Sequence, residues 1–265
     1  MNRLKLVLAG THIYSYEVYK LLIKVDLVDI VGILPNKSKV LNSEEKQKNK
    51  SYKFQVLNKF PKTEFKTIEE IKQIKPDLLL SIMYNQIFSK DFIELFSKGC
   101  WNLHPGILPD YRGRNIFYWT IMNDEKKCGV TFHEIVEKVD AGKILSTVEY
   151  RVDSDPTPQT LFVETRKKIA PFTIKMLSKI ISEDYNLVEN EISKGKIFNV
   201  ASVNYNNLVF NLEDYSTYMS FNRHMRAFFF PLLDQYPSVL WKGKKNKITN
   251  LNMLETYASF FESKK

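Results

Sequence analysis

The chain has 265 residues, 44% hydrophobic and 26% charged, which is typical of a folded globular protein and excludes collagen-like, disordered and disulfide-scaffold classes. At about 150 residues per domain, this length predicts one or two domains that can each bury a full core. The formal net charge of +9 comes mainly from lysines scattered along the chain, so we expect a solvated lysine surface and no nucleic-acid partner.

The first half of the chain alternates apolar runs of strand length with stretches of helical periodicity. Strands are predicted at residues 4–9, 28–34, 77–83 and 100–104. Helices are predicted at residues 14–25, 67–74 and 90–96. Residues 36–51 are polar and lysine-rich, which is typical of a solvated loop. The alternation predicts an α/β fold with a Rossmann-like, mostly parallel sheet flanked by helices, whose ligands bind at the carboxyl ends of the strands.

The pattern changes after residue 128. Two β runs, at residues 129–136 and 143–152, surround a loop. A long amphipathic helix is predicted at residues 160–182, and Pro171 is expected to interrupt it. The predicted sheet ends there.

The last 65 residues predict a separate, smaller unit. A helix is expected at residues 215–229, followed by a hairpin of residues 238–241 and 247–251 around a turn. We therefore expect a main domain at residues 1–200 and a small C-terminal helix and β-hairpin appendage at residues 201–265.

The two cysteines, Cys100 and Cys128, are too far apart for a CxxC redox or zinc motif. We therefore expect a cytoplasmic location and no metal. The apolar run at residues 6–9 is shorter than the about 7 to 15 residues of a signal-peptide core. No run reaches the about 18 apolar residues that span a membrane, so no membrane partner is expected.

The densest group of chemically useful residues is at residues 102–114, Asn-Leu-His-Pro-Gly-Ile-Leu-Pro-Asp-Tyr-Arg-Gly-Arg. Asn102 and His104 close a predicted strand, and alternation by two points both side chains to one face at the edge where ligands bind. Two prolines and two glycines then restrict the loop that follows. A rigid loop of this kind suits a binding or catalytic site.

A second group, Val139-Asp140-Ala141-Gly142, follows Thr131-Phe132-His133. An Asp before a glycine between two strands is often only a turn. Beside a His and an Asn amide, the same carboxylate has a chemical use. The His can accept a proton, the carboxylate can orient the His or take its proton, and the Asn amide can donate to a developing oxyanion. This set matches attack of an amine on a carbonyl.

Residues 102–113, together with Val130-Thr131-Phe132-His133 and Asp140-Ala141-Gly142, closely resemble the formyltransferases that use 10-formyltetrahydrofolate. The resemblance spans residues 4–152. It implies that Asn102, His104 and Asp140 are catalytic. Asn102 and a protonated His104 would then stabilise the oxyanion, and Asp140 would accept the amine proton directly or through water.

In similar enzymes the folate pocket is built from the loop after the preceding strand and the loop before the catalytic Asp. The resemblance therefore implies 10-formyltetrahydrofolate as co-substrate, held by Met83, Tyr84, Asn85, Ile87, Val136 and Val139. A flat pterin suits a slot with apolar walls and exposed backbone at its rim. Packing in the core is the alternative for Met83, Ile87 and Phe88.

The C-terminal part indicates which amine receives the formyl group. Initiator-tRNA enzymes of this family add a β-barrel of about 100 residues, the size of a separate domain, whereas only 65 residues follow residue 200 here. Residues 222–227 resemble the helix that opens the C-terminal part of both tRNA and sugar enzymes. Glycinamide ribonucleotide enzymes lack the Tyr111-Arg112-Gly113 of this loop.

The resemblance is therefore greatest to sugar N-formyltransferases acting on nucleotide-linked, dTDP-type 3- or 4-amino-dideoxysugars, in lipopolysaccharide O-antigen biosynthesis. Expected substrate-binding residues are His12, Tyr111, Arg112 and Arg114, because guanidinium groups pair with the two oxygens of a phosphate. Two alternatives stay open: an enzyme like methionyl-tRNA formyltransferase, and a catalytically inert folate- or nucleotide-binding dimer. A homodimer through the C-terminal hairpin is expected to bury Val239, Leu240 and Trp241, and packing in the chain's own core is the alternative for Trp241.

Overall fold

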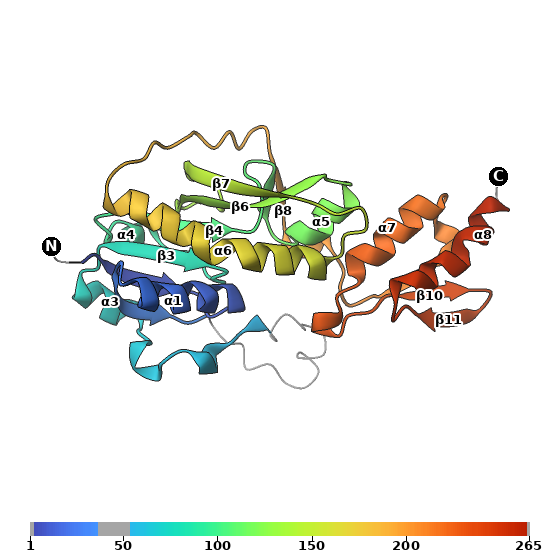
Figure 1. The fold of residues 1–265 in the computed structure, drawn as a ribbon, viewed down its shortest axis with the longest axis horizontal. Coiled ribbons are helices and arrows are strands. Elements are labelled where there is room, and N and C mark those ends of the chain that lie inside the picture. Colours follow the sequence, from blue (N-terminus) through green and yellow to red (C-terminus); the bar gives the residue numbers. More distant parts are fainter. Residues whose placement is uncertain (1–2, 37–53, 264–265) are drawn as a thin grey trace.

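The computed structural model describes residues 3–36 and 54–263 and is built around one six-stranded sheet (Figure 1). The strand order is β2-β1-β3-β4-β6-β7. The strands are β1 (Lys5–Ala9), β2 (Asp29–Leu34), β3 (Leu78–Ile82), β4 (Cys100–His104), β6 (Lys127–Glu134) and β7 (Ile144–Arg151). The first four are parallel, and β6 and β7 are antiparallel to their neighbours. The predicted α/β class with a mostly parallel sheet is confirmed.

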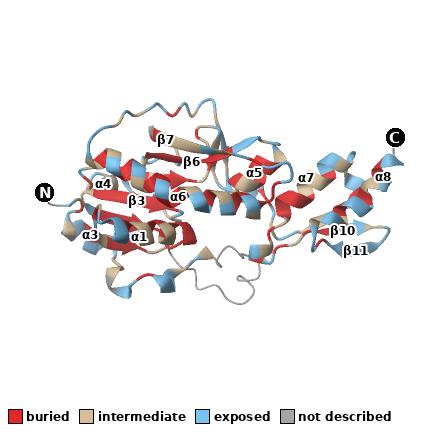
Figure 2. Cartoon of the chain, in the orientation of Figure 1, coloured by how far each residue is buried: buried red, intermediate tan, exposed pale blue. Residues whose placement is uncertain are grey.

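Helices cover both faces of the sheet, so its strands are apolar on both sides. Along β1, Leu6 and Leu8 point into one buried cluster, which also holds residues of α1 (Ile13–Val25) and α6 (Pro158–Ile181). The intervening Val7 and Ala9 point into a second cluster with residues of α3 (Ile68–Ile74) and α4 (Lys90–Ile93). Figure 2 shows the central strands buried and the outward sides of the helices exposed.

Two expectations for the main domain are corrected. Helix α6 runs through Pro171 without interruption, because Ile169, Ala170 and Phe172 on either side are buried against the sheet and hold the helix in place. The segment after β4, expected as a loop, also contains short elements that the sequence analysis does not predict. They are β5 (Tyr111–Gly113), which pairs with β8 (Lys196–Phe198), and α5 (Ile116–Met122).

The C-terminal unit is larger than one helix and a hairpin. Its three-stranded sheet has the order β11-β10-β9, with β9 (Val209–Asn211), β10 (Ser238–Trp241) and β11 (Lys244–Lys247). The helices are α7 (Tyr218–Phe228) and α8 (Ala258–Glu262). Strand β11 starts three residues before the predicted position, because all four of its residues are exposed and carry no apolar alternation.

The C-terminal unit has a core of its own, which includes Phe221, Met225 and Val239. Val239 is therefore inside the unit, and only Leu240 and part of Trp241 face outward. A further cluster joins Ala227 and Phe228 of α7 to residues of α5. The unit thus packs on the main domain through α7.

The remaining elements are short 3-10 helices: η2 (Leu57–Lys59), η3 (Lys62–Glu64), η4 (Val200–Ser202), η5 (Leu212–Asp214), η6 (Pro231–Leu233) and η7 (Leu251–Tyr257). Most of the loop predicted at residues 36–51 lies outside the described residues. Within residues 3–36 and 54–263, none of the helices is both long and apolar enough to cross a membrane.

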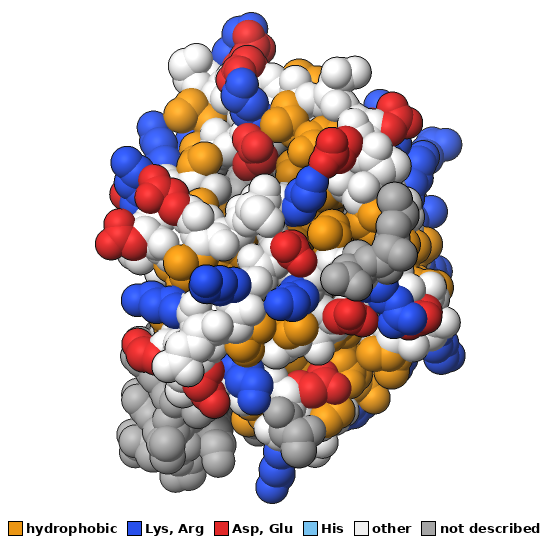
Figure 3. All heavy atoms as spheres, turned by 90° about the vertical axis from the view of Figure 1, so that its left-hand side faces the viewer, with side chains coloured by type: hydrophobic (Ala, Val, Ile, Leu, Met, Phe, Trp, Pro, Cys, Tyr) orange, Lys and Arg blue, Asp and Glu red, His pale blue; other side chains and the backbone are white. Residues whose placement is uncertain are grey.

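Charges of both signs are interspersed on the face of the main domain seen in Figure 3. Several lysines of the main domain form ion pairs, among them Lys98 with Glu183 and Lys20 with Glu17. On this face the basic residues therefore form no continuous patch of one sign.

Candidate active site

Four polar side chains meet on one face of the sheet at β4 and β6. Asn102 and His104 are two positions apart on β4, so both point to the same side. On the antiparallel neighbour β6, His133 lies opposite Asn102 and Thr131 lies opposite His104. Directly opposed residues share a face, so the strand pairing itself assembles the group.

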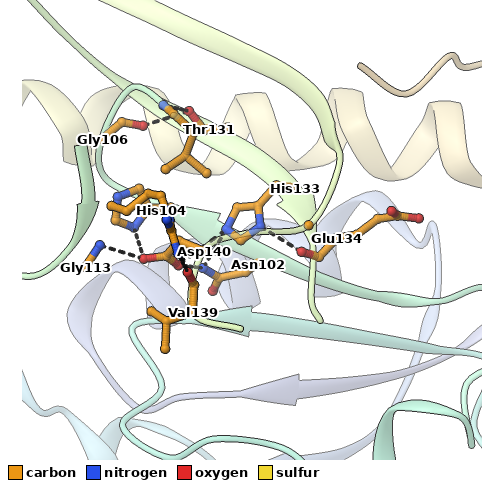
Figure 4. A network of polar contacts seen from close by, with 12 residues as sticks. Asn102, His104, Gly106, Gly113, Thr131, His133, Glu134, Val139 and Asp140 are labelled. Carbon is orange, nitrogen blue, oxygen red and sulfur yellow. Dashed lines mark hydrogen bonds and ion pairs between the residues drawn. The ribbon is translucent and has the colours of Figure 1, made fainter. Parts of the chain in front are cut away.

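Asp140 reaches this group from the turn between β6 and β7 (Figure 4). Its Oδ2 atom accepts a hydrogen bond from the Gly113 N–H at 2.8 Å and lies 3.5 Å from His104 Nδ1. Its Oδ1 atom lies 3.5 Å from Asn102 Nδ2 and 3.6 Å from His133 Nε2. The structure thus brings Asp140 to Asn102 and His104, although it lies 38 positions after Asn102 in the sequence.

The charge of Asp140 follows from these neighbours. Burial raises the pKa of the Asp140 carboxyl, but its polar neighbours, among them the Gly113 N–H that donates to it, lower it by more, so it lies well below its usual range. Asp140 is therefore an ionised carboxylate, which accepts hydrogen bonds and donates none.

This carboxylate fixes the orientation of the Asn102 amide. Because Asp140 only accepts, the amide group that faces it is the nitrogen, Nδ2. The same nitrogen donates to His133 Nε2 at 3.1 Å, which makes that ring nitrogen an acceptor. The hydrogen of His133 is then on Nδ1, which donates to the Glu134 carbonyl at 2.7 Å. His133 therefore holds the Asn102 amide in one orientation.

His104 is neutral in this environment, in contrast to the protonated ring expected from the sequence. Burial lowers the pKa of His104, and the Asp140 carboxylate raises it by less, so the net direction is downward. His104 Nε2 lies 2.6 Å from the Tyr111 carbonyl, an acceptor, so its hydrogen is on Nε2. Nδ1 therefore faces Asp140 without a hydrogen, in agreement with their separation of 3.5 Å.

Apolar side chains stand exposed beside this group. Met83 leaves β3 next to β4, and Ile87 follows in the same loop with 76% of its surface exposed. Val136 and Val139, in the loop that carries Asp140, are also exposed. Tyr84 of the first loop and Ile135 of the second both pack against one buried cluster, which also holds Phe88. The exposure of Met83 and Ile87 disfavours core packing for these two residues, whereas Phe88 is buried in the core.

Two of the predicted substrate residues have other partners. His12 is buried among the rings of Tyr14, Phe54 and Phe162, and its Nδ1 accepts the Tyr14 N–H as the cap of α1. Burial lowers the pKa of His12 to about 3, so it is neutral. The Tyr111 hydroxyl donates to Glu125 at 2.6 Å and accepts from Asn123 at 2.9 Å. The geometry assigns His12 to helix capping and Tyr111 to loop packing.

The two arginines of the loop differ. The guanidinium of Arg112 is buried and donates twice to the Val139 carbonyl, at 2.6 and 3.3 Å. It therefore supports the turn that carries Asp140, in contrast to the expected contact with a diphosphate. Arg114 is exposed, and within the described part of the chain no ion pair or hydrogen bond holds its guanidinium. Arg114 is thus available to an anionic ligand.

Three residues near the site were not assigned a role from the sequence. Thr131 accepts the Leu108 N–H at 3.2 Å and donates to the Gly106 carbonyl at 2.7 Å, which anchors the loop after β4. Alternation along β6 puts Thr131 and His133 on one face, and this signal could have found both. Asn190 donates to the Asp140 carbonyl at 3.0 Å. It lies 50 positions along the chain from Asp140, and no local pattern indicates this contact.

Comparison with known proteins agrees with this geometry. The family model for formyl transferases matches residues 4–176. ArnA, the bifunctional polymyxin resistance protein of Wigglesworthia glossinidia brevipalpis, is 32% identical over 145 residues, which are 54% of this chain and 21% of ArnA. Methionyl-tRNA formyltransferase of Borrelia duttonii is 26% identical over 195 residues, which are 71% of this chain and 62% of that protein. The chain thus spans about a fifth and about three fifths of these relatives.

A solved structure extends the fold match beyond the family model. WlaRD, a sugar 3N-formyl transferase crystallised in the presence of dTDP and 5-N-formyl-THF, superposes with a TM-score of 0.69 at 23% identity. The match covers 92% of this chain and 85% of WlaRD. The shared fold therefore includes most of the C-terminal unit. With the family model matching well over half of its residues, the chain belongs to the formyl transferase family.

Proposed function

We propose that this protein transfers the formyl group of 10-formyltetrahydrofolate to the amine of a dTDP-linked 3- or 4-amino-dideoxysugar, in the cytoplasmic synthesis of surface polysaccharide such as O-antigen. The observation that carries the proposal is the ionised Asp140 beside a neutral His104 and the oriented amide of Asn102. Membership of the formyl transferase family supports the reaction, and the fold shared with WlaRD supports the class of acceptor.

The proposed reaction begins with attack of the neutral amine on the formyl carbon. A new C–N bond forms, and the electron pair of the carbonyl moves to its oxygen. The Asn102 Nδ2 hydrogen that faces Asp140 makes only a long contact of 3.5 Å and is free to bond this oxyanion in its place, while the shorter bond to His133 keeps the amide in position. Asn102 is therefore the proposed oxyanion donor.

Asp140 and His104 supply the proton transfer. Asp140 Oδ2 and His104 Nδ1 lie 3.5 Å apart with no hydrogen between them, so together they can take the proton that the attacking amine loses. The pair then returns this proton to the folate nitrogen as the C–N bond to folate breaks. A His104 that was already protonated would have no place for this proton, so its lowered pKa suits the role.

The co-substrates are assigned to the two sides of this centre. The folate ring would lie against the exposed apolar side chains of Met83, Ile87, Val136 and Val139, with Tyr84 and Asn85 beside them. The nucleotide diphosphate would pair with Arg114, next to the loop that holds Asp140.

Specific observations favour a sugar over a tRNA acceptor. The C-terminal unit has three described strands in its sheet, fewer than a barrel needs, and the fold match to the sugar enzyme WlaRD covers 92% of this chain. The inert alternative is disfavoured because all three predicted catalytic groups converge.

We also propose a homodimer formed through the C-terminal hairpin. Leu240 of β10 is exposed, and the neighbouring Trp241 is half-buried, with the Lys242 amine 4.8 Å from its ring centroid. An exposed leucine and a partly exposed tryptophan next to each other are suited to a symmetric contact.

A panel of acceptors tests the proposed substrate class. The protein is mixed with 10-formyltetrahydrofolate and, separately, with dTDP-linked 3-amino and 4-amino sugars or methionyl-tRNA, and products are detected by mass spectrometry. We expect a gain of one formyl group on an amino sugar. Formylation of the tRNA alone would contradict the assignment. Arg114→Ala should raise the KM for the nucleotide sugar, whereas Arg151→Ala, an exposed arginine on β7, is the matched control.

A further inference from the structure

Residues 188–198, here called the strap, connect the two loops that form the active site. After α6 the chain runs back across the molecule to β8 (Figure 1). At one end of the strap, Val188 exchanges two backbone hydrogen bonds of 2.8 Å with Ile144, directly after the Asp140 turn. At the other end, β8 pairs with β5. The strap therefore contacts both the loop of Asp140 and the loop of Gly113.

Asn190 holds the Asp140 turn from within the strap. Its side-chain nitrogen donates to the Asp140 carbonyl at 3.0 Å and to the Gly142 carbonyl at 3.1 Å. Asn190 is only 8% exposed, so these bonds are shielded from water. Both partners are carbonyls, which only accept hydrogen bonds. The Asn190 amide nitrogen carries two hydrogens and can donate one to each carbonyl.

The turn needs such support because its backbone is strained. Asp140 has φ 47°, in the left-handed region that residues with a side chain seldom adopt. Such a residue persists only where its surroundings hold it. Arg112 binds the carbonyl of Val139, and Asn190 binds the carbonyl of Asp140 itself. The carbonyls at both ends of the peptide segment around Asp140 are therefore fixed.

The other end of the strap fixes the group that binds the Asp140 carboxylate. A Cβ atom on Gly195 would lie 1.8 Å from the Pro109 carbonyl, so the strap runs directly against the loop after β4. The Phe198 carbonyl accepts the Arg114 N–H at 2.7 Å. The adjacent Gly113 N–H donates to Asp140 Oδ2. The position of this donor thus depends on the strap.

We propose that the strap sets the distance between Asp140 and His104 for the reaction, and that Asn190 is a positioning residue in it. The expected effect on kcat rests on the proposed function, because it is measured as formyl transfer. Asn190 lies beyond residue 176, where the match to the family model ends, so that match assigns it no role.

The first test compares Asn190→Leu, which keeps the size and removes both hydrogen bonds, with Glu191→Ala, an exposed neighbour in the same strap. Misplacement of a catalytic group by about 1 Å can cost about a hundredfold in rate. For Asn190→Leu we expect kcat to fall at least tenfold, with KM for both substrates within twofold and circular dichroism unchanged. Glu191→Ala should keep kcat. A folded Asn190→Leu with kcat within twofold of wild type would overturn the proposal.

The second test needs no acceptor and so separates this inference from the proposed function. The pKa of the Asp140 carboxyl is measured by 13C NMR, with the signal assigned by its loss in Asp140→Asn. If Asn190 positions Asp140, Asn190→Leu raises this pKa toward the ordinary value and Glu191→Ala does not. An unchanged pKa in the folded variant refutes the strap's role even if wild type proves inactive on every acceptor. Asn190→Ser is measured in the same way if the leucine variant does not fold.

Discussion

At the scale of single residues, the site depends on which atoms carry protons. Asp140 is ionised, His104 carries its hydrogen on Nε2, and Asn102 presents its amide nitrogen to the centre. The ring hydrogens are placed by carbonyls, which can only accept: the Tyr111 carbonyl for His104 and the Glu134 carbonyl for His133. The Asp140 carboxylate, also an acceptor, orients the Asn102 amide. Backbone carbonyls thus determine much of the chemistry of these side chains.

The roles of Asn102 and His104 predict the cost of removing them. Loss of one oxyanion donor typically costs roughly 3 kcal/mol in the barrier, so Asn102→Ala should lower kcat at least about a hundredfold. His104→Ala should have a loss of similar size, because Asp140 then lacks its partner in proton transfer. Steady-state kinetics on folded variants measures both effects. Full activity in either variant would remove that residue from the mechanism.

His12 predicts a pH dependence of stability. Its pKa is about 3 in the folded protein against an ordinary 6.5, so below pH 6.5 the unfolded chain binds a proton that the folded protein does not. The free energy of unfolding should therefore decrease as the pH is lowered from 6.5 toward 3, by about 1.4 kcal/mol for each pH unit from this residue. His12→Asn retains a capping side chain but lacks this proton-binding group. Between about pH 6.5 and about pH 5, its free energy of unfolding should therefore decrease by roughly 2 kcal/mol less than that of wild type.

Urea denaturation of the two proteins at both pH values measures this difference. The other three histidines are present in both proteins, so their contributions cancel. Parallel loss of stability in wild type and His12→Asn would show that His12 is protonated in the folded state.

At the scale of elements, the strands of the sheet were predictable and the contacts of the loops were not. The strand at Cys100–His104 is predicted at its observed bounds. Its apolar residues indicate a strand, and the Pro-Gly sequence that follows indicates where it ends. The convergence of Asn102 and His104 with Asp140 could be expected from strand alternation together with the family resemblance. The partners of Arg112 and Asn190 could not be predicted from the sequence. Each side chain binds a carbonyl of the Asp140 turn, which lies far from it along the chain.

The pairing of β5 with β8 predicts a strong effect at Gly113. Its φ is +91°, and a Cβ atom there would lie 2.1 Å from the Phe198 carbonyl. Gly113→Ala should therefore push β8 away and displace the N–H that binds Asp140. We expect a lower midpoint of urea denaturation together with a loss of formyl transfer. An alanine variant as stable and as active as wild type would contradict the described pairing.

At the scale of the whole molecule, the C-terminal unit serves as an extension of the main domain. It contributes its own core around Phe221 and joins the main domain through Ala227 and Phe228. The sequence indicated its helix and hairpin but not β9, which is three residues long and pairs in parallel with β10. Such a short strand carries too little periodicity to be recognised. The division at residue 200 stays a prediction.

The proposed dimer gives a prediction at this scale. Light scattering of the purified protein should give twice the mass of one chain, and Leu240→Glu should give a single chain with unchanged circular dichroism, because it places a charge in the contact. Ile23→Glu, an exposed apolar position on α1, is the matched control and should remain dimeric. A wild-type protein that is monomeric at high concentration would contradict the proposal.

The most direct test of the account is formyl transfer by wild type and Asp140→Asn under the same conditions. The amide has nearly the shape of the carboxylate but cannot accept the amine proton. We predict that wild type formylates a dTDP-linked amino sugar only when 10-formyltetrahydrofolate is also present. Asp140→Asn should bind 5-formyltetrahydrofolate with unchanged affinity and form product at least about a hundredfold more slowly. Product formation at the wild-type rate by Asp140→Asn would contradict the central claim that this carboxylate, held against His104, carries the proton in the reaction.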